Sequence, residues 1–184
     1  MKTDDIRLVY EYNYWADQRI LTTCAKVSRE QYVAPTSDAS LRATLIHILD
    51  SEWAWRTAFQ EYFVANDSLK ERSQADEPKL WNHTDLTEAD LPTFDALKER
   101  WQADERAMRA YLGSLGDQDL NGLVRYRIPG GIVRERVLWH CLLHVVNHGT
   151  QHRSEAAVLL TNYGQSPGGL DFTAFLNEHF NLPS

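Results

Sequence analysis

Four long segments of the chain place apolar residues three and four positions apart, which is the spacing of one face of an α-helix. These segments span residues 5–27, 37–59, 93–115 and 133–163. Helices of this length bury their apolar faces most readily against one another, so the sequence predicts an all-α fold built as a four-helix bundle.

Residues that favour helix ends border these segments. Ser37, Asp38 or Ser40 is expected to cap the second helix and Thr93 the third, because their side-chain oxygens accept hydrogen bonds from free backbone N–H groups. Gly164 follows the fourth helix and is expected to end it.

Three smaller elements are expected between and after the helices. The polar segment 62–92 predicts a long loop, and loops of such length are uncommon unless they border a site. Val124, Tyr126 and Ile128 alternate ahead of a Pro-Gly-Gly turn, which favours a short hairpin. A short helix is expected over Asp171–Phe180.

The composition is that of one globular domain spanning residues 1–184, with 43% hydrophobic and 24% charged residues. The formal net charge of -7 disfavours binding to nucleic acid or to an anionic membrane. Cys24 and Cys141 lie far apart, and no signal-peptide or membrane-spanning run is visible, so a cytoplasmic protein is expected.

The fourth helix carries His140, His144, His148 and His152 at intervals of four residues. Residues i and i+4 lie on one helix face, where two imidazoles can bind one metal ion. On a helical wheel of about 100° per residue, His148 and His152 share the core-facing arc, whereas His144 lies at its edge and His140 outside it. The predicted ligand pair is therefore His148 and His152, although an HxxxH pattern also occurs by chance.

A third ligand is needed, and the spacing leaves His47, His83 and His179 as candidates. His47 is favoured because it alone lies on another long helix, where the neighbouring side chains are small. The bulky residues of that helix lie largely opposite, however, so the same wheel permits a His47 exposed at the surface.

Two carboxylates are candidate catalytic residues. Asp50 follows His47 by one turn and Asp104 lies in the apolar seam of the third helix, so either can orient an imidazole or accept a proton. The alternatives are a solvated Asp50 and a structural Asp104 with a buried partner. Arg153 is either a packing group or the partner of a carboxylate or an anionic substrate.

Together, these residues resemble the DinB-like superfamily, which includes YfiT-type metal-dependent hydrolases and thiol S-transferases. The resemblance covers nearly the whole chain and rests on His47 and on the motifs YNYWADQRIL, HVVNHGTQHRSE and NYGQSPGGLDFTAFL. It implies that His47, His148 and His152 hold a divalent metal. It also implies helices in up-down-down-up order and often a homodimer.

The chain departs from the superfamily pattern after the second histidine of the HxxxH pair. Members commonly continue with Arg-Gly-Gln, whereas this chain has Arg153-Ser154-Glu155. The change spares the ligands and adds a carboxylate beside them.

The expected function is that of a metal-dependent enzyme. Imidazoles suit zinc or nickel best, and iron or manganese is also compatible. Three imidazoles leave coordination positions open, so the ion can activate water or a low-molecular-weight thiol for hydrolysis or thiol transfer. The alternative is a non-catalytic, stress-associated dimeric protein that binds metal without turnover.

Overall fold

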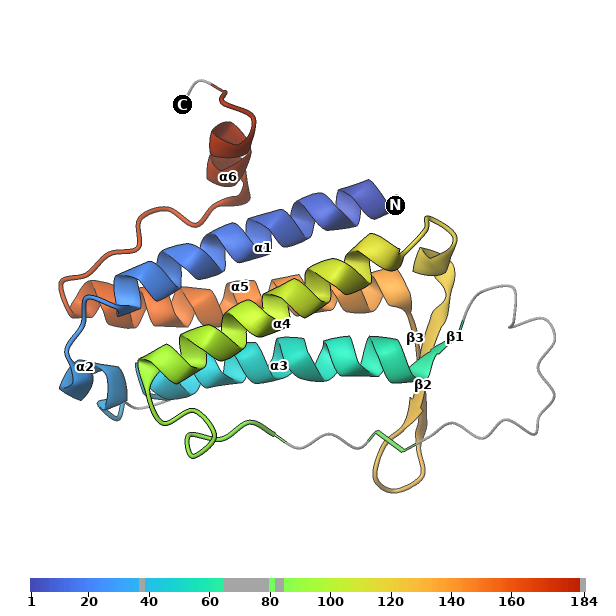
Figure 1. Ribbon diagram of the computed structural model, residues 1–184, viewed down its shortest axis with the longest axis horizontal. Helices are drawn as coiled ribbons and strands as arrows, with labels where there is room; N and C mark the ends of the chain where they lie inside the picture. Colours follow the sequence, from blue (N-terminus) through green and yellow to red (C-terminus); the bar gives the residue numbers. More distant parts are fainter. Residues whose placement is uncertain (37–38, 65–79, 82–84, 183–184) are drawn as a thin grey trace.

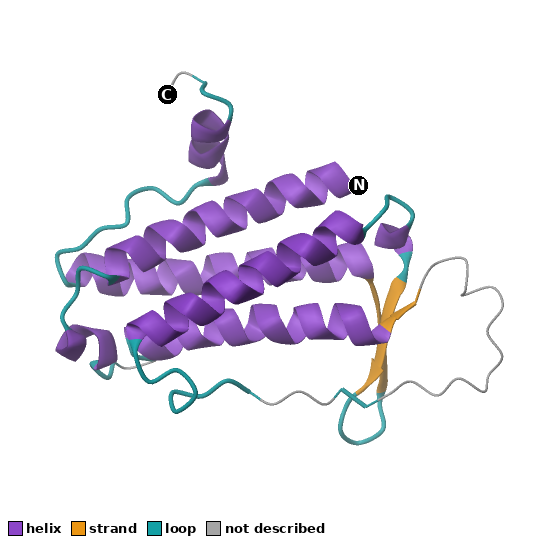
Figure 2. Cartoon of the chain, in the orientation of Figure 1, coloured by secondary structure: helices purple, strands orange, loops and turns teal. Residues whose placement is uncertain are grey.

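The computed structural model describes residues 1–36, 39–64, 80–81 and 85–182. Across these residues the fold is mostly helical, with a small antiparallel sheet at one end of the helices (Figure 2). The long helices are α1 (Thr3–Cys24), α3 (Leu41–Tyr62), α4 (Phe94–Ser114) and α5 (Leu138–Asn162). The short helices are α2 (Arg29–Val33) and α6 (Phe172–His179).

The four long helices lie side by side (Figure 1). α5 packs against both α1 and α3, and α4 packs against the same two helices. One cluster of buried apolar side chains, including Tyr10, Phe59 and Leu142, fills part of the space between them. A second cluster includes Leu45 and Leu97. The close packing of α3 against α5 decides which histidines can meet.

Two of the predicted helix starts are confirmed by their hydrogen bonds. The hydroxyl of Ser40 accepts from the backbone N–H of Ala43, and the hydroxyl of Thr93 accepts from that of Ala96. Ser37 and Asp38, the other two candidate caps, lie outside the described residues. Each cap satisfies an N–H group that has no partner within its own helix.

The predicted hairpin is confirmed and belongs to a larger sheet. Strands β2 (Leu123–Arg127) and β3 (Val133–Val137) pair in antiparallel fashion, and β1 (Phe63–Val64) adds to the other edge of β2. The turn carries Gly130 and Gly131, whose φ angles are 92° and 82°. Glycine adopts this left-handed region without the steric cost that other residues meet. The small sheet was only partly expected, since β1 is short and pairs with a distant segment.

The predicted start of the last long helix is wrong. Residues 133–137 form β3, and α5 begins at Leu138. β3 pairs residue by residue with β2, so that Val133 lies opposite Arg127 and Val137 opposite Leu123. Backbone N–H and C=O groups of this strand are therefore hydrogen-bonded in the sheet instead of within a helix. The β-branched valines also favour a strand.

The segment predicted as a long loop lies mostly outside the described residues. Of that segment, Tyr62 ends α3, β1 follows, and Leu80, Trp81 and residues 85–92 are described. The backbone N–H of Trp81 donates to the carbonyl oxygen of Arg127 at 2.7 Å, which attaches this stretch to the end of β2. α2, a single capped turn after α1, was not predicted.

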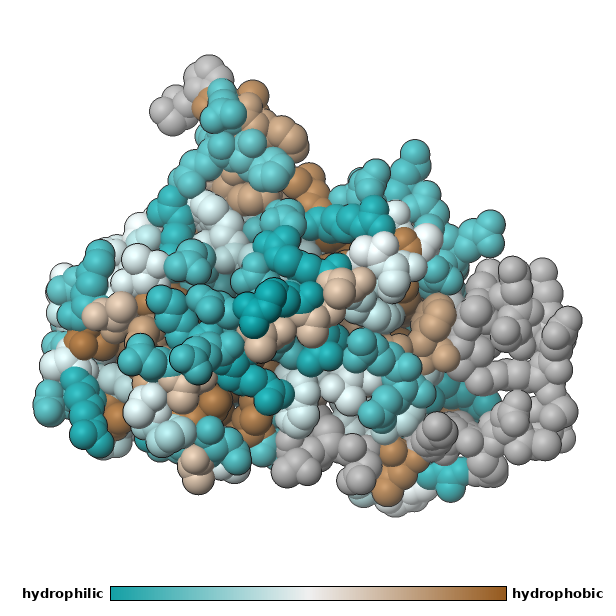
Figure 3. Space-filling view, viewed as in Figure 1, coloured by the Kyte–Doolittle hydropathy of each residue, from teal (hydrophilic) through white to brown (hydrophobic). Residues whose placement is uncertain are grey.

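The face of the molecule in Figure 3 is mainly hydrophilic over the long helices, and apolar residues gather beside α6. Among the described residues, every helix is too short or too polar to cross a lipid bilayer.

Candidate metal centre

Three histidines from two helices meet where α3 packs against α5. The ring centroid of His47 lies 4.9 Å from that of His148 and 4.5 Å from that of His152. The centroids of His148 and His152 are 4.5 Å apart, as expected for neighbouring turns of one helix. One nitrogen from each ring lies within 4.8 Å of the other two.

The three rings differ in exposure. His148 and His152 are half-buried on α5, whereas His47 is exposed on α3. His47 is therefore exposed, as the helical wheel permitted, and its ring still lies close to those of His148 and His152. The group lies at the rim of the helix contact, where it is accessible to solvent on the side of His47.

The electrostatics of the group favour neutral imidazoles at His148 and His47. The pKa of His148 is lowered to about 4. Removal from water is the main cause, and the neighbouring His152 and His47 add to it. Removal from water also lowers the pKa of His47, with a second contribution from His152. A neutral ring keeps the nitrogen lone pair that a metal ion binds, so the donor set fits a divalent cation.

Glu155 is a partner of the site that the sequence analysis did not assign. Its carboxylate oxygen lies 2.7 Å from Nδ1 of His152, one helical turn away. With Nδ1 held in this way, Nε2 of His152 is the nitrogen left for an ion, which is a common arrangement for metal-binding histidines. The i, i+3 spacing of the two residues was the signal that could have found this contact.

The two predicted carboxylates lie elsewhere. The carboxylate of Asp50 accepts a hydrogen bond from the backbone N–H of Leu86 at 2.7 Å, which ties α3 to the segment before α4. Asp104 is buried and forms an ion pair with Arg56 of α3. Neither joins the group of three histidines among the described residues.

The remaining histidines do not join the group either. The ring of His144 is exposed and lies 5.4 Å from that of Trp55. His179 belongs to α6, where its ring lies 5.0 Å from that of Phe175. His83 lies outside the described residues.

The residue after His152 belongs to a buried network of polar side chains. Arg153 follows His152, and its side chain points into the core between α1 and α5. Nη1 of Arg153 donates to Asn13 at 2.7 Å and to Asp17 at 2.9 Å. The amide of Asn13 donates to Glu52 of α3 at 3.2 Å. The network thus joins α1 to α3 and α5, the two helices that carry the histidines.

Burial determines the charges within this network. It raises the pKa of Glu52 well above its ordinary value, and repulsion from Asp17 adds to this effect. The pKa of Asp17 is also raised by burial, but the charge of Arg153 opposes that rise. The charge of Arg153 therefore favours the ionised form of Asp17, whereas burial and the charge of Asp17 favour the protonated form of Glu52.

Gly149 allows Arg153 to occupy this position. A Cβ atom at residue 149 would lie 2.7 Å from Nη1 of Arg153 and 3.2 Å from Oδ1 of Asn13. Both distances are shorter than ordinary contacts, so the glycine is required for the close approach of the guanidinium to α5.

Comparison with known proteins agrees with the geometry of the site. The family model described as the DinB family matches residues 1–180. The chain is 26% identical over 176 residues to Protein DinB of Bacillus subtilis (strain 168), and the match covers 91% of each chain. The resemblance inferred from the histidine motifs is confirmed, and the chain belongs to the DinB family.

Proposed function

We propose that the protein is a metal-dependent enzyme in which His47, His148 and His152 hold a divalent cation. The reaction we propose is hydrolysis or thiol transfer, with water or a low-molecular-weight thiol as the nucleophile. The observation that carries this proposal is the position of three imidazole nitrogens, from two helices, within 4.8 Å of one another.

The donor set supports zinc or nickel as the ion, with iron or manganese as the other candidates. Among the described residues, no fourth His, Cys, Asp or Glu joins the group, which is typical of catalytic sites that keep positions open for a substrate. A bound divalent cation lowers the pKa of a coordinated water or thiol and so supplies a nucleophile near neutral pH.

The residues of the chain prepare this site in distinct ways. Glu155 orients the ring of His152 through Nδ1. Arg153 anchors the same turn of α5 to α1 through Asp17. The packing of α3 against α5 then brings His47 to the other two rings. We propose no role in the reaction for Asp50 or Asp104, since both are engaged with other partners.

The alternative function is a non-catalytic, stress-associated dimeric protein that binds metal. It requires only the three imidazoles, which can bind a metal ion without a reaction, and membership of a family does not by itself fix an activity. Turnover distinguishes the two functions, since the alternative predicts metal binding without any thiol-dependent or hydrolytic activity.

We also assign the long helices to the up-down-down-up bundle of the superfamily and propose a homodimer. The colours in Figure 1 support the first assignment, because α3 and α4 run in one direction and α1 and α5 in the other. Exposed Phe172 and Phe180 offer apolar surface for a second copy. Light scattering of the purified protein would measure the dimer directly, and a monomer at all concentrations would contradict it.

Thermal melting of the metal-free protein with added zinc, nickel, iron or manganese tests metal binding. A ligand that binds only the folded state raises the melting temperature. We expect a rise in the wild type and in His144→Ala, and no rise in His148→Ala. His144 is the matched control because it lies one turn away on the same helix. Equal shifts in the two variants would contradict the proposed ligand set.

Assays with the loaded protein then test catalysis. Small thiols with an electrophilic acceptor, and a panel of ester and amide substrates, cover the two proposed reactions. Activity that disappears in His148→Ala and persists in His144→Ala supports the proposal. Metal binding without activity across the panel favours the non-catalytic alternative.

A further inference from the structure

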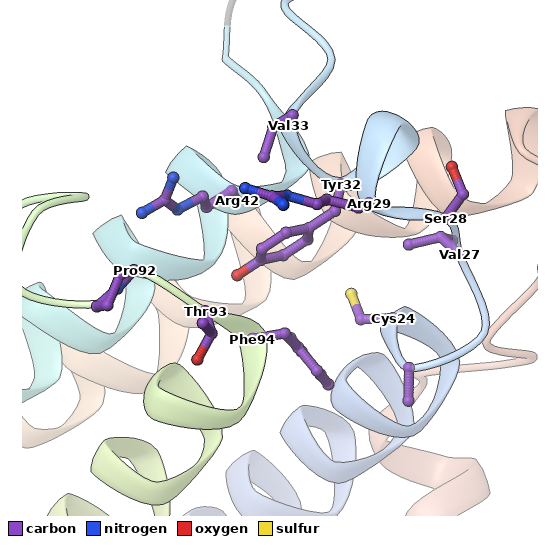
Figure 4. A pocket seen from close by; sticks show the side chains of 11 residues that line it. Cys24, Val27, Ser28, Arg29, Tyr32, Val33, Arg42, Pro92, Thr93 and Phe94 are labelled. Carbon is purple, nitrogen blue, oxygen red and sulfur yellow. The ribbon is translucent and has the colours of Figure 1, made fainter.

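A cavity of about 380 Å³ lies at the end of the long helices that is remote from the sheet. Its walls come from the end of α1, from α2 and from the first residues of α3 and α4 (Figure 4). None of the three clustered histidines lines it. Its volume falls within the range of about 300–1000 Å³ that is usual for small-molecule sites.

Tyr32 lines this cavity and has a buried hydroxyl without a hydrogen-bond partner. The residue is only 7% exposed, and its hydroxyl forms no hydrogen bond with any of the described residues. Figure 4 shows its ring in the middle of the lining residues, with the hydroxyl on the side of Arg42 and Thr93. A buried polar group without a partner destabilises the folded state, so a ligand that accepted a hydrogen bond from this hydroxyl would remove that cost.

Arg42 supplies a second donor that is already held in place. Its Nη1 lies 3.1 Å from the Glu88 carboxylate, and its Nη2 donates to the carbonyl oxygen of Leu91 at 2.9 Å. Its Nε is buried and has no partner within the described part of the chain. Two nitrogens of the guanidinium are therefore held by other residues, and Nε can still donate a hydrogen bond.

The charge and polarity of the walls define the ligand. Arg29 and Arg42 both line the cavity, whereas the lining residues include no Asp or Glu. The apolar side of the cavity contains Val27 and Phe94, and the ring of Phe94 lies 5.6 Å from that of Tyr32. Arg42 is already paired with a carboxylate, whereas Arg29 forms no ion pair with the described residues. Two unpaired donors beside these guanidinium groups favour an anionic acceptor, and the apolar wall favours a hydrocarbon body.

We propose that this cavity is a binding site for a small carboxylate with an apolar body. The carboxylate accepts hydrogen bonds from the Tyr32 hydroxyl and from Nε of Arg42, while the body packs against Val27 and Phe94. The site is separate from the histidines, so it exists whether or not the proposed metal chemistry is correct.

Binding at this site is non-covalent. The thiol of Cys24 lines the cavity, but burial raises its pKa to about 12. It is therefore a neutral thiol near pH 7, and only the thiolate is a good nucleophile. Cys24 contributes packing surface to the ligand.

Calorimetry with phenylacetate and hexanoate, and with the neutral phenylacetamide as the control ligand, tests the proposal on the full chain. We expect both carboxylates to bind the wild type and His148→Ala equally well, and phenylacetamide to bind at least tenfold more weakly. Absence of binding by both carboxylates at millimolar concentration would overturn the proposal, and so would equal binding of phenylacetamide.

Tyr32→Phe gives two opposite signals that a purely structural tyrosine would not produce. Removal of an unpaired buried hydroxyl should raise the melting temperature of the ligand-free protein, yet weaken phenylacetate binding roughly tenfold. Tyr126→Phe is the matched control, because Tyr126 is also 7% exposed but belongs to β2. Unchanged phenylacetate affinity in Tyr32→Phe would overturn the assignment of the donor.

Discussion

The guanidinium of Arg153 lies 2.9 Å from the carboxylate of Asp17, and both side chains are almost completely buried. Arg153 directly follows His152, a candidate metal ligand. One turn of α5 therefore supplies a histidine to the site and an arginine to the core. Changes in this buried pair are expected to affect both folding and the geometry of the histidines.

Substitution of Arg153 by leucine should lower the free energy of unfolding by about 3–5 kcal/mol, because it leaves the Asp17 charge buried without a partner. Urea unfolding followed by circular dichroism measures this loss. The double variant Asp17→Asn with Arg153→Leu removes both charges and should be more stable than the single variant. A loss below about 1 kcal/mol in the single variant would show that Asp17 is not held as an ion.

Gly149→Ala should lower the free energy of unfolding by about 1–3 kcal/mol, since the new methyl group would collide with Arg153. Gly113→Ala is the matched control. Gly113 also lies within a long helix, but a Cβ there would meet nothing within 4 Å. Because Gly113 is close to the end of α4, alanine there should stabilise the protein by less than about 1 kcal/mol. Similar effects of both substitutions on the urea midpoint would argue against the collision.

Glu155→Gln should weaken metal binding about tenfold, because the charged partner of His152 Nδ1 is replaced by a neutral amide. Competition with a chromophoric chelator measures the affinity. Ser154→Ala changes the adjacent residue, whose hydroxyl donates to the carbonyl oxygen of Thr150, and should leave the affinity unchanged. An increase in affinity after Glu155→Gln would mean that the carboxylate competes with the ion for the ring.

The metal-free protein should become less stable as the pH falls from 6.5 towards 4. The pKa of His148 is lowered from 6.5 to about 4 in the folded state. The unfolded chain therefore takes up a proton in this range before the folded chain does, and this uptake favours unfolding. The slope of stability against pH should be smaller in His148→Ala than in His144→Ala. Parallel slopes in the two variants would exclude this origin.

Glu52→Gln should make the protein more stable above about pH 5. The pKa of Glu52 is raised by burial, so its contribution to stability is complete below the unfolded value of 4.5 and declines as the pH rises towards the folded value. The decline can reach about 1.4 kcal/mol per pH unit for one group. Glutamine has no proton to lose, so the difference between variant and wild type should grow as the pH rises above about 5. A constant difference would contradict the raised pKa.

Much of the local structure could be predicted from the sequence. The apolar spacing located the long helices, and Ser40 and Thr93 were among the predicted caps. The hairpin forms around the Pro-Gly-Gly turn, as expected. The neighbouring positions of His148 and His152 also followed, because residues four apart within one helix are neighbours whatever the rest of the chain does.

Contacts between distant segments could not be predicted in this way. Phe63 and Val64 form β1 because β2 is available as a partner, and the apolar pattern alone did not show that partner. Asp104 was known to need a buried partner, but only the packing of α3 beside α4 identified Arg56. The anchoring of Arg153 on Asp17 likewise depends on the packing of α1 against α5.

The candidate site shows the same division. The sequence by itself determined that two imidazoles share one face of α5, since the helical repeat depends only on local backbone geometry. Only the tertiary structure decided that His47 joins them, because its place depends on how α3 is rotated and shifted against α5. That arrangement results from the burial of many apolar side chains at once, so it belongs to the packed core and to no single segment.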